Sequence, residues 1–303
     1  MEFLKWLAPL RTPMLDPVIS VITLMGDETF FTVLGLMLLW CLNKRWGFRF
    51  LIAGLAGSVM NQLLKAIFLI PRPWVLDESF TIIESAREGA SGYSFPSGHT
   101  QSAAAVFGMT ASYFKRRWVT VICLLGVLLV GFSRMYLGVH TPLDVGVSLL
   151  TGLVTVLGFN WLFDRWENSA KGRKMISLGA IAFALLLLCY VLFAPKRPGN
   201  VPEFDAHGVE AAWKLTGTLA GILLAWWADS RFIRFETKAV WWAQVLKMGI
   251  GLLLVLGVQK GLKPVFNTLF DGAAFAHGLR YLLMGVVGGV VWPMTFRFWA
   301  RLK

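Results

Sequence analysis

The amino-acid sequence predicts an all-α fold, a polytopic membrane helical bundle with about nine transmembrane helices. The 303-residue chain is 56% hydrophobic and only 15% charged, whereas about a quarter of the residues of a soluble domain are charged. Apolar runs recur along the chain, and a run of about 20 residues is long enough to cross a bilayer as a helix. Basic residues fall mainly at alternate ends of these runs, which is typical of membrane proteins.

The first 26 residues are predicted to hold an interfacial helix, because no apolar run there is long enough to span. Phe3 and Trp6 lie beside Lys5 within residues 2–11, a pattern typical of a helix that lies in the membrane surface. A secretory signal is the alternative, but no small-residue cleavage site follows. Nine spans are then predicted, at residues 28–43, 48–70, 98–114, 118–134, 142–163, 174–194, 211–228, 239–259 and 279–296.

A polar break over residues 164–174 divides the chain, and every chemical motif described below precedes it. We therefore predict three parts. They are an interfacial N-terminal helical segment over 1–26, a helical core over 27–165 that holds the motifs, and a C-terminal four-span membrane extension over 166–303.

The net charge of +12 is explained by a membrane rather than by nucleic acid, and no nucleic-acid partner is predicted. Most Lys and Arg residues lie in five segments, at residues 44–49, 115–117, 165–174, 231–238 and 297–303. Cytoplasmic loops hold such an excess, so the motifs at the other ends of the spans face outward. We predict a bacterial plasma membrane protein whose site faces the periplasm or the exterior; a luminal site in the endoplasmic reticulum is the alternative.

The segment that begins at His140 predicts a histidine held in one tautomer. Thr141 can cap the following helix and Pro142 suits its first turn, which places Asp144 four residues after His140 on the same helix face. A carboxylate that accepts the Nδ1 proton leaves Nε2 unprotonated and able to act as a nucleophile. A purely structural His–Asp hydrogen bond at a helix cap is the alternative.

The sequence Pro96-Ser97-Gly98-His99 predicts a phosphate cradle at the start of a helix. Backbone N–H groups at a helix N-terminus favour an anion, and Gly98 allows the backbone to approach it closely. The Ser97 hydroxyl adds a donor, and a protonated His99 beside the phosphate can give its proton to a leaving alcohol. An ordinary helix start is the alternative for this turn.

Three basic residues complete the set: Lys65 and Arg72 near the end of one predicted span, and Arg134 at the end of another. Arginine suits forked contacts with phosphate oxygens, and fixed cations stabilise the charge that builds on phosphorus under attack. A lysine that only extends to the membrane surface is the alternative for Lys65. The long connection 71–97 is predicted to be either a lid that contacts substrate or a solvated connector.

Together, the motifs Lys-x6-Arg-Pro, Pro-Ser-Gly-His and Ser-Arg-x5-His-x3-Asp resemble the type-2 phosphatidic acid phosphatase superfamily, the lipid phosphate phosphatases. The match is residue for residue, from Lys65 to Asp144, and the resemblance covers roughly residues 15–163. It implies a helical bundle whose active site opens near the outer leaflet, and a reaction that needs no metal and no cofactor. It implies a phosphohistidine on His140, orientation of that histidine by Asp144, proton transfer by His99, and phosphoryl oxygens held by Lys65, Arg72, Ser97, Gly98 and Arg134.

The predicted function is therefore an integral-membrane phosphatase acting on a lipid phosphate or diphosphate, with polyprenyl diphosphate, phosphatidylglycerol phosphate and phosphatidic acid as candidates. A phosphotransferase from polyprenyl diphosphate to another lipid is an alternative, because the same phosphohistidine serves both reactions. A transporter or scaffold on the same fold is a third hypothesis, although a scaffold has no need of His99, His140 and Asp144 together. Membrane lipids are the other expected partners, and a homo-oligomer is left open.

Overall fold

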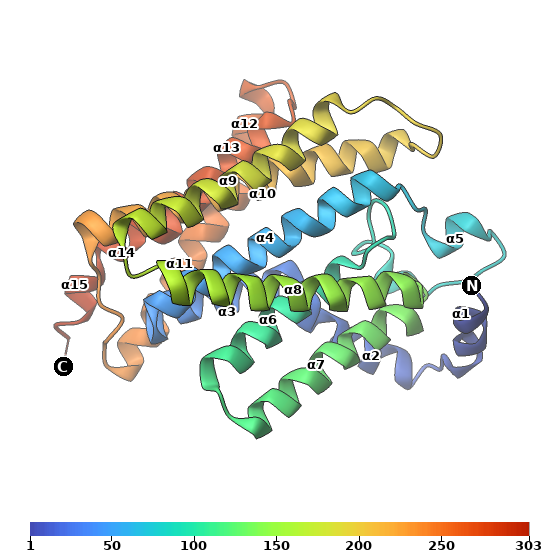
Figure 1. The fold of residues 1–303 in the computed structure, drawn as a ribbon, viewed down its shortest axis with the longest axis horizontal. Helices are drawn as coiled ribbons and strands as arrows, with labels where there is room; N and C mark the ends of the chain where they lie inside the picture. Colours follow the sequence, from blue (N-terminus) through green and yellow to red (C-terminus); the bar gives the residue numbers. More distant parts are fainter. Residues whose placement is uncertain (303) are drawn as a thin grey trace. The chain divides into compact units, whose positions relative to one another are not determined.

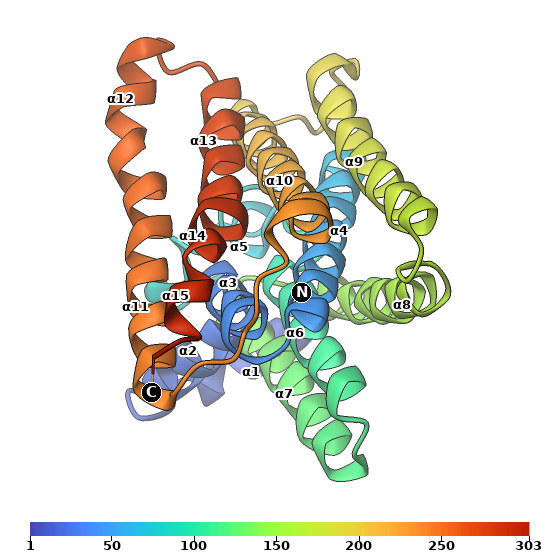
Figure 2. The same ribbon diagram turned by 90° about the vertical axis from the view of Figure 1, so that its left-hand side faces the viewer.

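The computed structural model describes residues 1–302, and all regular secondary structure within them is helical (Figures 1 and 2). Six segments are long and apolar enough to cross a membrane: Lys44–Leu76, Arg117–Tyr136, Pro142–Trp166, Ala170–Phe193, Trp241–Leu269 and Phe275–Met294. A seventh forms if Leu15–Gly26 and Glu28–Leu42, which are bent by 51° relative to each other, count as one span. The predicted all-α membrane fold is confirmed.

The predicted number of nine spans is not confirmed. Two of the predicted spans, 98–114 and 211–228, form helices that do not reach the length or apolarity of a span. Helix α6 (Gly98–Phe114) has only 17 residues. In α10 (Pro202–Ala228), Lys214 and several Gly, Thr and Trp residues lower the hydropathy of the predicted segment.

The chain forms two compact units, each built from separate stretches of sequence. The first combines Met1–Phe31, Gly57–Asn160 and Cys189–Gly208, and the second combines Thr32–Ala56, Trp161–Leu188 and Val209–Lys303. All three motifs fall in the first unit. The predicted division into 1–26, 27–165 and 166–303 stays a prediction.

Helices of the first unit pack around α7 (Arg117–Tyr136). Both α6 and α2 (Leu15–Thr23) contact α7 (Figure 1), and α1 (Glu2–Leu7) contacts it as well. The part of α4 (Lys44–Phe68) that begins at Gly57 and the part of α8 (Pro142–Trp166) that ends at Asn160 belong to the same unit. The motifs lie at the ends of α4, α7 and at the starts of α6 and α8.

The second unit holds the parts of α3 (Glu28–Met37), α4, α8, α9 (Ala170–Phe193) and α10 that lie outside the first unit, together with the last helices. Trp40 is fully buried there and donates a hydrogen bond of 2.8 Å to the carbonyl of Gly288. The buried Arg49 donates to the Glu167 carboxylate at 2.6 Å. The last helices are α11 (Trp241–Leu256), α12 (Leu262–Leu269), α13 (Phe275–Val286), α14 (Trp292–Met294) and α15 (Phe296–Trp299). Of these, α12 packs against α13 (Figure 2).

The long connection 71–97 packs onto the turn between α7 and α8. It contains the short helix α5 (Pro73–Leu76), and its Ala86 and Ala90 join a buried apolar cluster with Leu137 and Val139. Ile83 donates its backbone N–H to the Leu137 carbonyl at 3.1 Å. The connection therefore covers the turn that holds His140, as the lid hypothesis requires, and contact with substrate stays a prediction.

Candidate active site

The turn over residues 137–141 presents His140, and the N-terminal segment braces it. Gly138 has a φ of +82°, a conformation that residues with a side chain rarely adopt. Arg11 donates from Nε to the Tyr136 carbonyl at 2.9 Å and lies over the Phe80 ring. The segment predicted to lie in the membrane interface thus also contacts the turn before the histidine.

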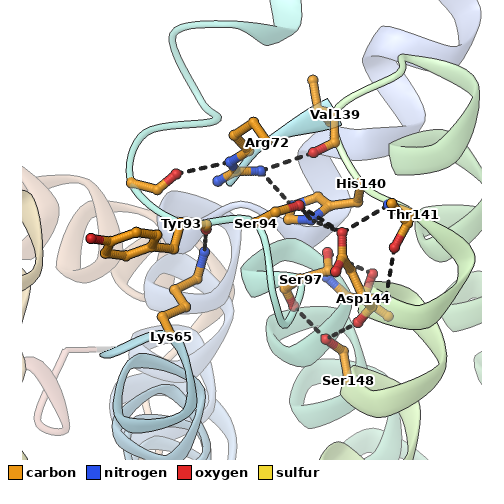
Figure 3. A network of polar contacts seen from close by, with 12 residues as sticks. Lys65, Arg72, Tyr93, Ser94, Ser97, Val139, His140, Thr141, Asp144 and Ser148 are labelled. Atoms are coloured by element: carbon orange, nitrogen blue, oxygen red, sulfur yellow. Dashed lines mark hydrogen bonds and ion pairs between the residues drawn. The ribbon is translucent and has the colours of Figure 1, made fainter. Parts of the chain in front are cut away.

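Asp144 is fixed at the start of α8 by a reciprocal cap. Thr141 Oγ1 accepts the Asp144 N–H at 3.3 Å, and Asp144 Oδ2 accepts the Thr141 N–H at 2.8 Å, which is the arrangement of a capping box. The same oxygen accepts the Ser94 hydroxyl at 2.6 Å and lies 3.4 Å from His140 Nδ1 (Figure 3). Two other donors therefore orient the carboxylate toward the imidazole.

Arg72 fixes the tautomer of His140 (Figure 3). Its NH1 atom lies 2.9 Å from His140 Nε2. Because a guanidinium can only donate hydrogen bonds, Nε2 must accept, and the ring proton resides on Nδ1 beside Asp144. This is the tautomer that a nucleophilic Nε2 requires.

Backbone carbonyls hold the rest of the Arg72 guanidinium. Its Nε donates to Gly92, NH1 to Val139 and NH2 to Ser91, each at 3.0 Å. The sequence predicted a forked contact between this side chain and phosphate. In the structure its hydrogen bonds join the 71–97 connection to the His140 turn, and contact with phosphate stays a prediction.

Lys65 and Arg134 are buried cations, with exposed fractions of 7% and 1%. The Lys65 ammonium donates to the Tyr93 carbonyl, and Arg134 NH1 donates to Thr23 Oγ1 at 2.9 Å. The Arg134 Nε and NH2 atoms are buried and have no hydrogen-bond partner among residues 1–302. Buried charged donors without acceptors are costly, so these two atoms mark a place that suits an anion.

Ser97 caps α6 and ties two motifs together. Its Oγ accepts from the Thr100 N–H at 3.4 Å and from the Thr100 hydroxyl at 2.9 Å, and Gly98 is the first helical residue. The Ser97 N–H donates to the Asp144 carbonyl at 3.2 Å. Ser148 Oγ bonds the carbonyls of both Ser97 and Asp144, at 2.9 and 2.8 Å. These hydrogen bonds thus fix the predicted cradle relative to the start of α8, next to His140.

His99 is half-buried in the first turn of α6, beneath the 71–97 connection. A methyl group placed on Gly89 would lie 3.7 Å from His99 Cε1, so the connection covers this imidazole. The structure therefore places His99 next to the predicted cradle and under the predicted lid.

The pKa of His140 is affected by several of the other predicted site residues. Its pKa lies well below the ordinary value, mainly because burial disfavours the charged ring. The charges of Arg72, Arg134 and Lys65 lower it further, in that order. All three predicted phosphate-binding cations therefore act on the same imidazole, which stays neutral and unprotonated at Nε2.

This low pKa leads to a prediction about pH dependence. A nucleophilic His140 loses activity when it is protonated, so a lowered pKa moves the acidic limb of kcat/KM below the ordinary histidine pKa of about 6.5. We expect kcat/KM not to fall as the pH is lowered from 7.5 through 6.5, after correction for the ionisation of the substrate phosphate. A profile in which half of the activity is already lost above pH 6.5 would contradict this assignment.

Two site residues were missed by sequence reasoning. Ser94 bonds the Asp144 carboxylate and Thr23 bonds Arg134, yet each contact joins residues far apart in the chain. Serine and threonine are common in turns and helix ends, so their types gave no signal. The position of Ser94, two residues before Pro96, is the single hint in the sequence.

Comparison with known proteins identifies the family. Residues 46–168 match the model of the PAP2 superfamily, and residues 213–301 match that of the PAP2 superfamily phosphatase, transmembrane extension. No solved structure matches the chain. The family matches thus cover both the segment with the motifs and the last helices.

Named relatives agree with these matches. Undecaprenyl-diphosphatase BcrC of Bacillus subtilis is 37% identical over 117 residues, which cover 39% of this chain and 55% of that relative. Phosphatidylglycerophosphatase B of Bacillus subtilis is 30% identical over 175 residues, 52% of this chain and 82% of the relative. Glucose-6-phosphatase catalytic subunit 1 of Bos taurus is 28% identical over 264 residues, 74% of this chain and 73% of the relative. The chain belongs to the PAP2 superfamily.

Proposed function

We propose that this protein is an integral-membrane phosphatase that hydrolyses a lipid phosphate or diphosphate through a phosphohistidine on His140. The proposal rests on one observation: His140 is held between Asp144 and Arg72, with its Nε2 unprotonated, among three buried cations. A neutral imidazole surrounded by fixed positive charge suits attack on a phosphate better than any structural role, because the cations repel a protonated ring and attract the substrate.

The proposed reaction has two steps. His140 Nε2 attacks phosphorus, the bond from phosphorus to the leaving oxygen breaks, and His99 gives that oxygen a proton. When Nε2 attacks phosphorus, it no longer accepts the hydrogen bond from Arg72. The same Arg72 N–H can then donate a hydrogen bond to a phosphoryl oxygen. Lys65 and Arg134 stabilise the charge of the transition state. Water, activated by His99, then breaks the N–P bond and frees inorganic phosphate.

The candidate substrates are polyprenyl diphosphate, phosphatidylglycerol phosphate and phosphatidic acid. The names of two relatives, an undecaprenyl-diphosphatase and a phosphatidylglycerophosphatase, support the first two. We also propose that the site faces the periplasm or the exterior of a bacterial plasma membrane, because the Lys and Arg excess lies at the opposite ends of the spans. A cysteine replacing the exposed Glu88 should then react with an impermeant maleimide on intact cells, and a failure to react would contradict this orientation.

The function is tested by phosphate release from a panel of these lipids, using the purified protein in liposomes. We expect release from at least one lipid, inhibition by orthovanadate, and no loss on addition of EDTA. Among residues 1–302 no three His, Cys, Asp or Glu side chains gather as for a metal ion, and loss of activity with EDTA would contradict the metal-independent reaction. An acceptor lipid that takes up the phosphoryl group at the expense of free phosphate would favour the phosphotransferase, and inactivity on every lipid would favour a transporter or scaffold.

His99 should matter in proportion to how poor the leaving group is. For a lipid alkyl phosphate we expect His99→Ala to lower kcat about 10²–10⁴-fold, the usual contribution of a general acid. For an activated aryl phosphate, whose phenolate leaves without a proton, the loss should be much smaller. The measurement is the ratio of the two losses, and equal losses would contradict the acid role.

A further inference from the structure

Residues 91–93 present a row of backbone carbonyls to two of the proposed phosphate-binding cations. Arg72 donates to the carbonyls of Ser91 and Gly92, both at 3.0 Å, and Lys65 donates to the carbonyl of Tyr93. Figure 3 shows Lys65 reaching this stretch of chain, with the Tyr93 ring pointing away from the imidazole. The positions of both cations therefore depend on where this stretch lies.

The other side of residues 91–93 is held by a segment distant in sequence, residues 196–207, which we call the latch segment. At its end, His207 Nε2 lies 3.1 Å from Ser91 Oγ. Gly92 has a φ of +69°, and a side chain there would come within 3.0 Å of His207 Cδ2. The two segments are thus in close contact at the residues whose carbonyls bind Arg72.

Tyr93 makes the second attachment, through its hydroxyl. It donates to Asp205 Oδ1 at 2.9 Å and accepts the Val201 N–H at 2.8 Å, while its ring packs edge-on against Phe204 at 5.2 Å. One end of this residue therefore bonds the latch segment, and its carbonyl bonds Lys65.

Asp205 is the centre of the latch segment. It accepts from Lys196 at 2.7 Å and from the Asn200 amide at 3.0 Å, in addition to Tyr93. Partial burial acts to raise its pKa, but the hydrogen bonds from these three residues hold the pKa below the ordinary value. The carboxylate is therefore charged at neutral pH and keeps all three acceptor contacts.

Arg197 attaches the same segment to the helix that holds Lys65. Its NH2 atom donates to the carbonyls of Ala66 and Ile67, at 3.0 and 2.9 Å, in the last turn of α4, where such carbonyls lack a partner within the helix. The latch segment thus contacts Tyr93, whose carbonyl accepts from Lys65, and also the last turn of α4, which carries Lys65.

Hydrogen bonds make most of these attachments, together with the contact between the Tyr93 and Phe204 rings. A pocket lies between the latch segment and the end of α4, lined among others by Gln62, Lys65, Leu69, Tyr190 and Pro195. Neither family match covers the latch segment, since one ends at residue 168 and the other begins at 213. Its contacts with the site are thus a property of this chain's connecting segment.

We propose that the latch segment is a positioning element for phosphate binding: Asp205 and His207 hold residues 91–93, whose carbonyls hold Lys65 and Arg72. This inference rests on the proposed roles of these two cations. Asp205 and His207 touch neither phosphate nor His140 in this scheme, and act only through the position of the cations. Catalytic groups tolerate little displacement, because a shift of about 1 Å can cost roughly a hundredfold in rate.

Two variants release the latch by different routes. Tyr93→Phe removes one hydroxyl and keeps the ring and the carbonyl, and Asp205→Asn removes the central charge. Glu203→Gln is the matched control, since it removes an exposed carboxylate from the same first turn of α10. We expect each latch variant to lower kcat/KM and to weaken the binding of labelled orthophosphate about tenfold, and the control to change neither.

The pH profile separates positioning from mere stability. The charges of Lys65 and Arg72 help to lower the His140 pKa, so cations that leave their places should let the acidic limb of kcat/KM move to higher pH in the latch variants. The inference is overturned if phosphate affinity and the acidic limb stay at their wild-type values in folded Tyr93→Phe protein, whatever happens to its melting temperature. If instead the wild-type protein hydrolyses no lipid, the proposed function fails. The orthophosphate affinities of the wild type and the latch variants then still test whether the latch segment positions the two cations.

Discussion

Replacing His140 by alanine is expected to reduce lipid phosphatase activity at least about a thousandfold, because the proposed nucleophile has no substitute in the site. Asp144 and Arg72 orient this ring on its two nitrogens, and neither of them can form the same intermediate at neutral pH. The variant should still fold and insert, since the capping bonds between Thr141 and Asp144 do not involve the ring. Phosphate release in liposomes measures the loss.

A covalent label gives a second, independent test of the same residue. With a substrate labelled in the phosphoryl group, the wild-type protein should retain a label that is lost in acid and kept in alkali, as a phosphohistidine is. His140→Ala and the closer mimic His140→Asn should retain none. Ser94→Ala is the matched control, because it removes a hydrogen bond to Asp144 and a 3.5 Å contact with His140 Nδ1 but leaves the His140 ring in place, and it should slow labelling without preventing it. Normal turnover of His140→Ala would rule out the nucleophile.

Most helices, and the boundary near residue 27, could be predicted from the sequence because apolar length is a local property, but the size of the bend at that boundary could not. The chain bends by 51° between α2 and α3, beside Gly26. A side chain at Gly26 would come within 2.5 Å of the His99 carbonyl, so the bend brings the N-terminal segment against the start of α6. The bend is thus accompanied by a contact with a helix more than seventy positions away, which no local pattern records.

Most of the candidate site residues could be predicted from the sequence because their residue types are rare within apolar runs. Histidines, arginines and a carboxylate at the ends of spans demand an explanation. Hydroxyl groups do not, and so Thr23 and Ser94 were missed although both bond a predicted site residue. Spacing also predicts which residues meet, but not which neighbour each one binds. Arg72 illustrates this, since backbone carbonyls occupy much of a side chain that was predicted to grip phosphate.

Replacing Arg134 by glutamine is expected to have the largest effect on phosphate binding. Its Nε and NH2 atoms are buried without a hydrogen-bond partner among residues 1–302, while Thr23 holds NH1. Removing one partner of a buried, hydrogen-bonded charge pair costs about 2–5 kcal/mol, or roughly 30-fold to 5,000-fold in affinity. We therefore expect orthophosphate and orthovanadate to bind at least about thirtyfold more weakly, and kcat/KM to fall by a similar factor.

Stability without ligand distinguishes an anion site from a structural arginine. A buried charge whose donors lack acceptors destabilises the folded protein, so Arg134→Gln should melt at the wild-type temperature or above it when no phosphate is present. Added phosphate should raise the melting temperature of the wild type and leave that of the variant unchanged. Arg134→Lys keeps the charge but loses the fork and should recover only part of the affinity. A variant that binds phosphate normally and melts lower would show that Arg134 supports the helices rather than the substrate.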